Sequence, residues 1–103
     1  MAYNLIITGR AVITLNHDLS FLIKIAQAKA KALLLLDELE TIYHRIAENP
    51  GQFPVCGDEI LAEKGIRKAI LVKSKYNVLF NVSGSDVYIR AIVSMKQKYT
   101  GIL

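Results

Sequence analysis

The chain has 103 residues, of which 52% are hydrophobic and 21% charged, and this composition excludes an intrinsically disordered chain. The length predicts one domain, residues 1–103. No apolar run approaches the roughly 18 residues of a membrane span, and the first residues lack a signal-peptide pattern. Because Cys56 is the one cysteine, no internal disulfide can form. We therefore expect a cytoplasmic protein with no membrane partner.

Charge is distributed unevenly along the chain. Residues 1–63 carry five basic and eight acidic side chains, a net charge of −3, whereas residues 64–103 carry eight basic and one acidic, a net charge of +7. This asymmetry favours an anionic partner for the C-terminal part, either nucleic acid or an acidic protein segment. The alternative is that the positive charge keeps a small domain soluble.

The N-terminal half predicts one strand followed by helix. Asn4–Thr8 is apolar and β-branched, which is typical of a strand. Residues 11–24 are ambiguous, because Val12, Ile13, Thr14 and Ile23 favour a strand whereas the apolar spacing fits a helical face, and we predict a helix. Apolar positions in residues 27–48 recur at spacings of three and four before Pro50 ends the helix. Since no glycine or proline separates the two segments, a helix hairpin and a single long helix over Asp18–Glu48 both remain open.

The C-terminal half predicts a sheet. After a loop over Gln52–Gly65, in which Asp58–Lys64 fits one helical turn, the apolar period changes to two. Three strand-like runs separated by short turns predict an antiparallel meander, and they are Ile66–Lys73, Tyr76–Val82 and Val87–Val93. The expected fold class is α+β, with an N-terminal strand and a helix pair packed on one face of an antiparallel sheet, in the order β-α-α-β-β-β.

The turn at residues 83–86 sets the register of the last two strands. If Val82 lies opposite Val87, then Phe80 faces Ile89, Val78 faces Ala91 and Tyr76 faces Val93. This apolar face is predicted to take the helices. The predicted core is Leu35, Leu39, Ile42, Ile46, Val78, Phe80, Ile89 and Ala91.

The opposite face of the sheet is the candidate site. It is predicted to be a mixed polar surface, continued by a basic tail after the last strand, whose side chains could contact phosphate or an acidic segment and stack on a base. Ile70, Val72, Leu79 and Ile92 share this face, which is more apolar area than a solvated sheet needs, so we expect a partner segment or the chain's own C-terminus to cover it. The candidate binding residues are Lys68, Asn77, Asn81, Tyr88, Arg90, Lys96, Lys98 and Tyr99.

The chain carries no recognisable catalytic signature. There is no glycine-rich phosphate loop and no metal-ligand spacing, and His17 and His44 belong to different predicted helices. Cys56 has no visible base beside it, which favours a small loop side chain over a nucleophile. We assign no catalytic residue, no metal and no cofactor.

The order of elements resembles the RelE/ParE-like toxins of type II toxin–antitoxin modules, which include plasmid stabilisation proteins. Leu36–Pro50 is similar to the family's second helix, with its Ala-Glu-x-Pro ending. Ile66–Lys68 followed by Lys75–Val82 is similar to its strand pair. Asp86–Val93 with Lys96–Lys98 is similar to its last strand and basic end. The likeness covers nearly the whole chain.

The resemblance implies a growth-inhibiting toxin that forms a hetero-oligomer with a cognate antitoxin protein. RelE-like members cut messenger RNA on the ribosome with basic residues and a tyrosine, whereas ParE-like members inhibit DNA gyrase. Lys68 matches one basic position of the nuclease pattern, but Asn77 and Gln97 stand where arginines are expected, and Tyr99 is the nearest tyrosine. Without its phosphate-clamping arginine a nuclease loses transition-state stabilisation, so the ParE-like branch is favoured. The alternatives are the mRNA endonuclease and a small basic nucleic-acid-binding module.

Overall fold

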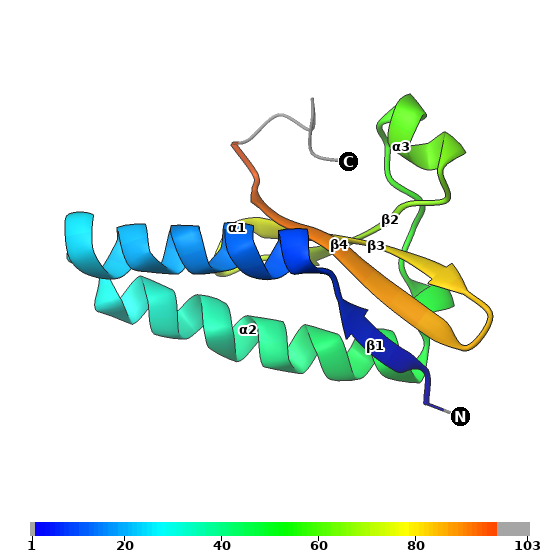
Figure 1. The fold of residues 1–103 in the computed structure, drawn as a ribbon, viewed down its shortest axis with the longest axis horizontal. Coiled ribbons are helices and arrows are strands. Elements are labelled where there is room, and N and C mark those ends of the chain that lie inside the picture. Colours follow the sequence, from blue (N-terminus) through cyan, green and yellow to red (C-terminus); the bar gives the residue numbers. More distant parts are fainter. Residues whose placement is uncertain (1, 97–103) are drawn as a thin grey trace.

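The structure is a computed structural model that describes residues 2–96. A helix hairpin lies along one side of a four-stranded sheet, and a short helix stands on the other side (Figure 1). The elements in chain order are β1 (Asn4–Ile7), α1 (Gly9–Ser20), a π-helical segment (Phe21–Ile25), α2 (Lys29–Glu48), a 3-10 turn (Pro50–Gln52), α3 (Glu59–Glu63), β2 (Arg67–Leu71), β3 (Tyr76–Ser83) and β4 (Asp86–Ser94).

The N-terminal helices form a hairpin, so the single long helix is excluded. Thr8 caps α1 by accepting a hydrogen bond from the backbone N–H of Ala11. The helix continues as the π-helical segment, and the chain then reverses through Gln27, whose φ of 51° is left-handed. Glutamine rarely adopts this conformation, which is why the sequence shows no turn signal here. The long apolar stripe of α2 packs on the sheet as predicted, through Leu35, Leu39, Ile42 and Ile46.

The sheet has the strand order β1-β4-β3-β2. Strands β2, β3 and β4 form the predicted antiparallel meander, and the predicted α+β class is confirmed. β1 pairs parallel to β4, with Asn4 beside Asp86 and Ile7 beside Ile89, so the sheet as a whole is mixed. In the first hairpin of the meander Leu71 lies opposite Tyr76 and Ile70 opposite Asn77, which places Lys68 and Ile70 on the same face as Leu79, as predicted.

A β-bulge in β4 corrects the predicted register. Val87 lies opposite Val82 and Ile89 opposite Phe80, as expected, but the pairing then shifts and Leu79 lies opposite Ala91. The predicted pairs of Val78 with Ala91 and of Tyr76 with Val93 are therefore wrong. Arg90 is the extra residue, and one inserted residue exchanges the faces of all the residues that follow it. Ile92 consequently packs in the main core, while Ala91 and Val93 lie on the opposite face.

An apolar cluster lies on each face of the sheet. The main core joins the helices to β3 and β4 around Phe80, and the phenyl ring of Phe53 meets that of Phe80 edge-on at 5.8 Å. A second apolar cluster covers the other face, where the segment before β2 closes over Leu79. Its residues are Cys56, Leu61, Ile66, Leu79, Ala91 and Val93. The predicted open face is thus partly covered by the chain itself, and Leu79 is fully buried.

Truncation of Phe80 tests the main core. Phe80 has no exposed surface, so Phe80→Ala should lower the free energy of unfolding by about 3–5 kcal/mol through lost burial and a residual cavity. Ile25→Ala, at a side chain that is 72% exposed, should change it by less than about 0.5 kcal/mol. Urea denaturation measures both values. Equal effects of the two substitutions would contradict the predicted core.

Candidate functional site

Three predicted site residues form a polar cluster on the bulged side of the sheet. Asn81 on β3 lies directly opposite Tyr88 on β4. The Arg90 side chain donates a hydrogen bond from Nε to Oδ1 of Asn81 at 2.7 Å, and its guanidinium lies 5.0 Å from the centre of the Tyr88 ring. All three side chains are partly exposed. The cluster therefore fixes one guanidinium against an aromatic face at a surface that a ligand can reach.

The other predicted residues have different surroundings. Lys68 is partly exposed on β2, and Lys96 is exposed after the end of β4. Asn77 is only 7% exposed, so the prediction that it lies on an exposed surface is wrong: the structure places its side chain among buried residues of β3. Lys98 and Tyr99 lie outside the described residues.

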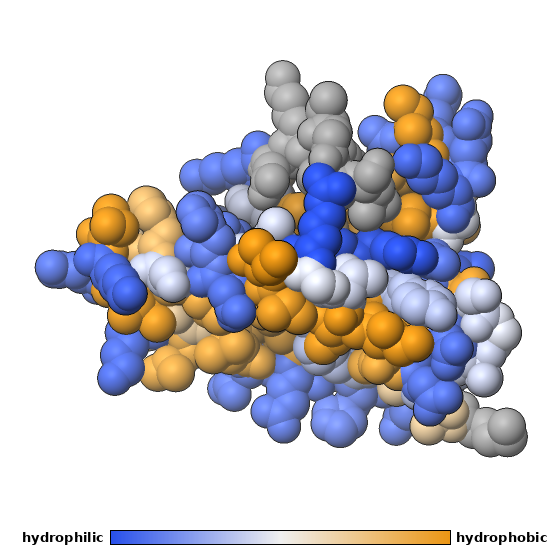
Figure 2. Space-filling view, in the orientation of Figure 1, coloured by the Kyte–Doolittle hydropathy of each residue, from blue (hydrophilic) through white to orange (hydrophobic). Residues whose placement is uncertain are grey.

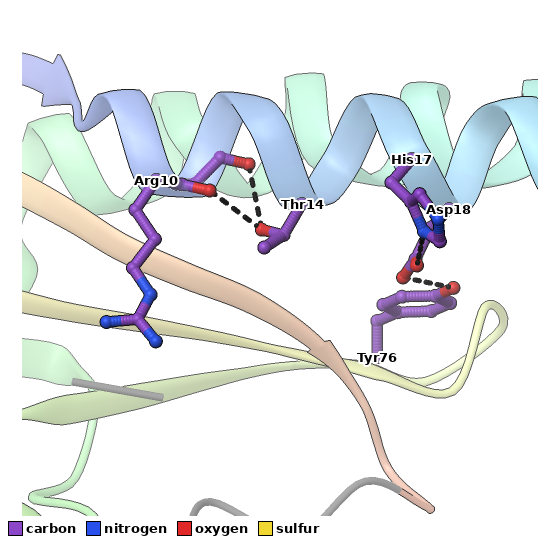
Figure 3. A network of polar contacts seen from close by, with 6 residues as sticks. Arg10, Thr14, His17, Asp18 and Tyr76 are labelled. Atoms are coloured by element: carbon purple, nitrogen blue, oxygen red, sulfur yellow. Dashed lines mark hydrogen bonds and ion pairs between the residues drawn. The ribbon is translucent and has the colours of Figure 1, made fainter. Parts of the chain in front are cut away.

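A hollow of about 250 Å³ opens beside Arg90. Its lining includes Thr8 and Arg10 from the start of α1, and Ile66 from the second apolar cluster. Figure 3 shows the Arg10 side chain extending away from α1 toward the strands. Sequence reasoning missed Arg10, because only the parallel pairing of β1 with β4 brings the start of α1 beside the bulge.

A second polar network fastens α1 to β3. The Tyr76 hydroxyl donates a hydrogen bond to Oδ2 of Asp18 at 3.2 Å, and Nδ1 of His17 lies 3.9 Å from the other carboxylate oxygen (Figure 3). Burial of the Tyr76 side chain, together with the charge of Asp18, raises its pKa to about 12. Tyr76 therefore remains a neutral donor near neutral pH, and the network holds the helix hairpin against the sheet.

The outer edge of β2 borders a groove that sequence reasoning did not predict. Pro54 accepts a hydrogen bond from the outward N–H of Lys68, which covers the first half of this edge. The alternation of an antiparallel pair then directs the N–H and C=O of Ile70 outward as well. The groove between this edge and α2 has a volume of about 510 Å³, and its lining includes Leu34, Asp37, Thr41, Ile70 and Val72. An extended segment could pair with this free edge.

Glu38 shapes one end of this groove. Its carboxylate accepts hydrogen bonds from the backbone N–H groups of Lys73 (3.2 Å) and Ser74 (2.6 Å), in the loop between β2 and β3. Partial burial alone would raise the pKa of Glu38. The hydrogen bonds from Ser74 and Lys73 and the Lys73 charge outweigh it and hold the pKa below the usual 4.5.

Exposed apolar side chains gather on the helix side of the molecule. Figure 2 shows a hydrophobic band along the face that presents α1, α2 and β1, with hydrophilic residues on either side. The exposed large apolar side chains of β1 and the hairpin are Ile6, Ile7, Val12, Ile13, Phe21, Ile23, Ile25, Leu33 and Leu36. An apolar surface of this extent, rimmed by polar residues, is typical of a protein-interaction site.

Metal and membrane sites are not found among residues 2–96. No group of three or more His, Cys, Asp or Glu side chains in this range is placed to hold a metal ion. None of its helices is both long enough and apolar enough to span a bilayer. Cys56, the one thiol, is buried in the second apolar cluster.

The fold is similar to that of a solved toxin–antitoxin structure. No protein-family model and no curated protein matches the sequence. The structure superposes on a chain from the "Chromosomal ParDE TA system from P. aeruginosa" with a TM-score of 0.69 and 19% sequence identity. The alignment covers 90% of this chain and 96% of that chain, so the two share nearly their entire fold.

The Glu38 contacts predict a pH-dependent contribution to stability. Because the folded-state pKa is lowered, the contribution is present above the usual value of 4.5 and is lost as the pH falls through the folded value. Glu38→Gln should therefore be less stable than the wild type by about 1 kcal/mol at pH 7, and this difference should shrink toward pH 3. Glu40→Gln, at an exposed carboxylate of the same helix, is the control. Chemical denaturation across the pH range measures both. A difference that stays constant with pH would contradict the role of the charge.

Proposed function

We propose that the chain is the toxin component of a type II toxin–antitoxin system, that it acts in the ParE-like manner by binding and inhibiting DNA gyrase, and that a cognate antitoxin neutralises it. The observation that carries this proposal is the shared fold, which extends over 96% of a chain from a ParDE system. The sequence motifs that resemble the RelE/ParE-like toxins point in the same direction and come from an independent comparison.

The burial of Asn77 supports binding rather than RNA cleavage. The nuclease pattern requires an accessible arginine in the middle strand, and here that position is a buried asparagine. Among the described residues of the bulged face, the polar cluster offers a guanidinium, an amide and a phenol.

The exposed surfaces support a protein partner. An antitoxin segment that covers the apolar band of the hairpin would remove hydrophobic surface from water, and an extended stretch could pair with the free edge at Ile70. One antitoxin chain that covered both surfaces would contact β1, the helix hairpin and β2 at once.

One observation favours the endonuclease as the second candidate. Arg90 stacked on Tyr88 is a suitable pair for a phosphate and a base, which a ribosome-dependent nuclease would also need. The same pair fits the small nucleic-acid-binding module.

Two assays on the purified chain separate these candidates. We expect inhibition of the supercoiling of relaxed plasmid by DNA gyrase, with activity restored by the product of the antitoxin gene. We expect no cleavage of messenger RNA on translating ribosomes. Ribosome-dependent cleavage without gyrase inhibition would reject the ParE-like assignment and establish the endonuclease. Nucleic-acid binding with neither activity would indicate the binding module.

A charge-removal variant tests the basic surface. Lys68→Ala, Arg90→Ala, Lys96→Ala and Lys98→Ala together should abolish growth inhibition, because surface charges set association and each contributes on the order of 1 kcal/mol. None of the three described positions belongs to either apolar cluster, so the variant should fold. The matched control replaces Lys24, Lys29, Lys31 and Lys73 with alanine. Full growth inhibition by the folded charge-removal variant would show that the functional surface lies elsewhere on the chain.

A further inference from the structure

We propose that the groove beside β2 and a hollow at the tip of the helix hairpin form one trough, and that this trough binds an extended segment of a partner protein with an acidic and a basic side chain four residues apart. The tip hollow has a volume of about 290 Å³ and lies between the start of α2 and the loop that joins β2 to β3. This inference rests on the part of the proposed function that gives the chain a protein partner, and it makes no use of gyrase.

The two hollows are continuous. Leu34 and Lys73 line the groove beside β2 and also line the tip hollow. The trough therefore runs from Lys31, in the first turn of α2, past Leu34 to the outward edge of β2 at Ile70. A long, open trough beside a strand edge suits an extended chain better than a compact ligand.

The edge of β2 offers backbone hydrogen bonds to such a segment. The N–H and C=O of Ile70 are directed away from β3, and among residues 2–96 no backbone group pairs with them. Val72, which is 74% exposed, adds apolar surface beside the groove. Since Pro54 already covers the edge at Lys68, the pairing with an added strand is short. Side chains must therefore supply most of the specificity.

The two ends of the trough carry opposite charges. Lys31 and Lys75 line the tip hollow, whereas Asp37 and Glu40 line the groove. All four side chains are exposed, and none of them makes an ion pair within residues 2–96. A segment with one acid and one base can therefore pair with both ends at once, and a uniformly charged segment is repelled at one of them.

The other charges that line the trough already have neighbours. The positive charge of Lys73 lies close enough to the Glu38 carboxylate to help lower its pKa, so these two side chains compensate each other in the middle of the trough. At the far end of the groove, the Arg45 guanidinium lies 5.3 Å from the centre of the Phe53 ring. The middle, beside Leu34, is left apolar and nearly neutral.

Helix geometry sets the spacing of the two charges on the bound segment. Lys31 and Glu40 are nine positions apart on α2, which corresponds to about 13–14 Å along the helix axis. A strand rises about 3.4 Å per residue, so about four residues span this distance. Because alternate residues of a strand share a face, an acid and a base four residues apart point to the same side. The residue midway between them lies near Leu34 and should be apolar.

Nuclear magnetic resonance of the full chain with two synthetic peptides tests the trough. The matching peptide is Ser-Glu-Val-Leu-Val-Lys-Ser with blocked ends, and the control, Ser-Val-Leu-Glu-Lys-Val-Ser, has the same composition with adjacent charges. We expect the matching peptide to bind with millimolar affinity and to cause saturable shifts of the backbone amides of Leu34, Ile70 and Val72. The control should bind about fivefold more weakly, because its charges reach one end of the trough at a time.

Charge reversal at the tip hollow tests which end takes the acid. Lys31→Glu combined with Lys75→Glu should weaken binding of the matching peptide about tenfold, and this variant should prefer Ser-Lys-Val-Leu-Val-Lys-Ser. Lys24→Glu combined with Lys29→Glu is the matched control, because it makes the same change of charge on the hairpin at residues that line neither hollow. All four side chains are exposed, so both variants should keep the dispersed spectrum of the folded chain.

Several outcomes would overturn the proposal. One is the absence of saturable shifts at Ile70 and Val72, and another is equal affinity of the matching and control peptides. A folded tip-hollow variant that keeps the wild-type preference would also contradict it. If the two amides shift with protein concentration in the absence of peptide, a second copy of the chain occupies the trough instead. Gyrase inhibition is measured without peptide, so its absence would reject the proposed function and leave the peptide result standing.

Discussion

The structure depends on one strand, β4, that is buried on both faces and paired on both edges. It lies between β1 and β3 in the sheet, with Ile89 and Ile92 in the main core and Ala91 and Val93 beneath the segment that precedes β2. A regular strand alternates its faces and would direct residues 89, 91 and 93 to one side. The bulge at Arg90 breaks this alternation. The strand can therefore supply apolar residues to both the main core and the second apolar cluster, and Arg90 remains partly exposed.

The same bulge explains how far the sequence could predict the fold and the site. Period-two runs and turn residues predicted the meander and the pairs on the turn side of the bulge, since local turn chemistry fixes register. The sequence Ile89-Arg90-Ala91-Ile92-Val93 is apolar at four of five positions, so alternation could not show where the register shifts. The residues placed on the wrong face, Ala91, Ile92 and Val93, all follow Arg90. The exposure of Asn77 was wrongly predicted for a different reason, because its burial depends on tertiary packing, which the strand pattern does not encode.

The candidate site, too, could be predicted only in part from the sequence. Asn81, Tyr88 and Arg90 could be grouped from the sequence, because two of them are cross-strand neighbours and the third follows two positions later. Arg10 and the free edge of β2 could not, because each depends on which strand lies at which position in the sheet. The parallel pairing of β1 brings the start of α1, and with it Arg10, beside β4. Among residues 2–96 no strand lies beyond β2, so Ile70 is on the last strand of the described sheet.

The distribution of charge separates two surfaces that a partner or target could use. Between Asp18 and Asp37 the chain has three lysines and no acid, and this stretch spans the apolar tip of the hairpin. A second copy of the chain docked there would bring lysines against lysines, whereas an acidic amphipathic segment would pair with them and cover the apolar band. Arg90, in contrast, lies against the Tyr88 ring at a hollow whose lining includes Thr8, Arg10 and Ile66. Neutralisation by a segment bound on the apolar band would require either that this segment extend to Arg90 or that it block the approach of a large target.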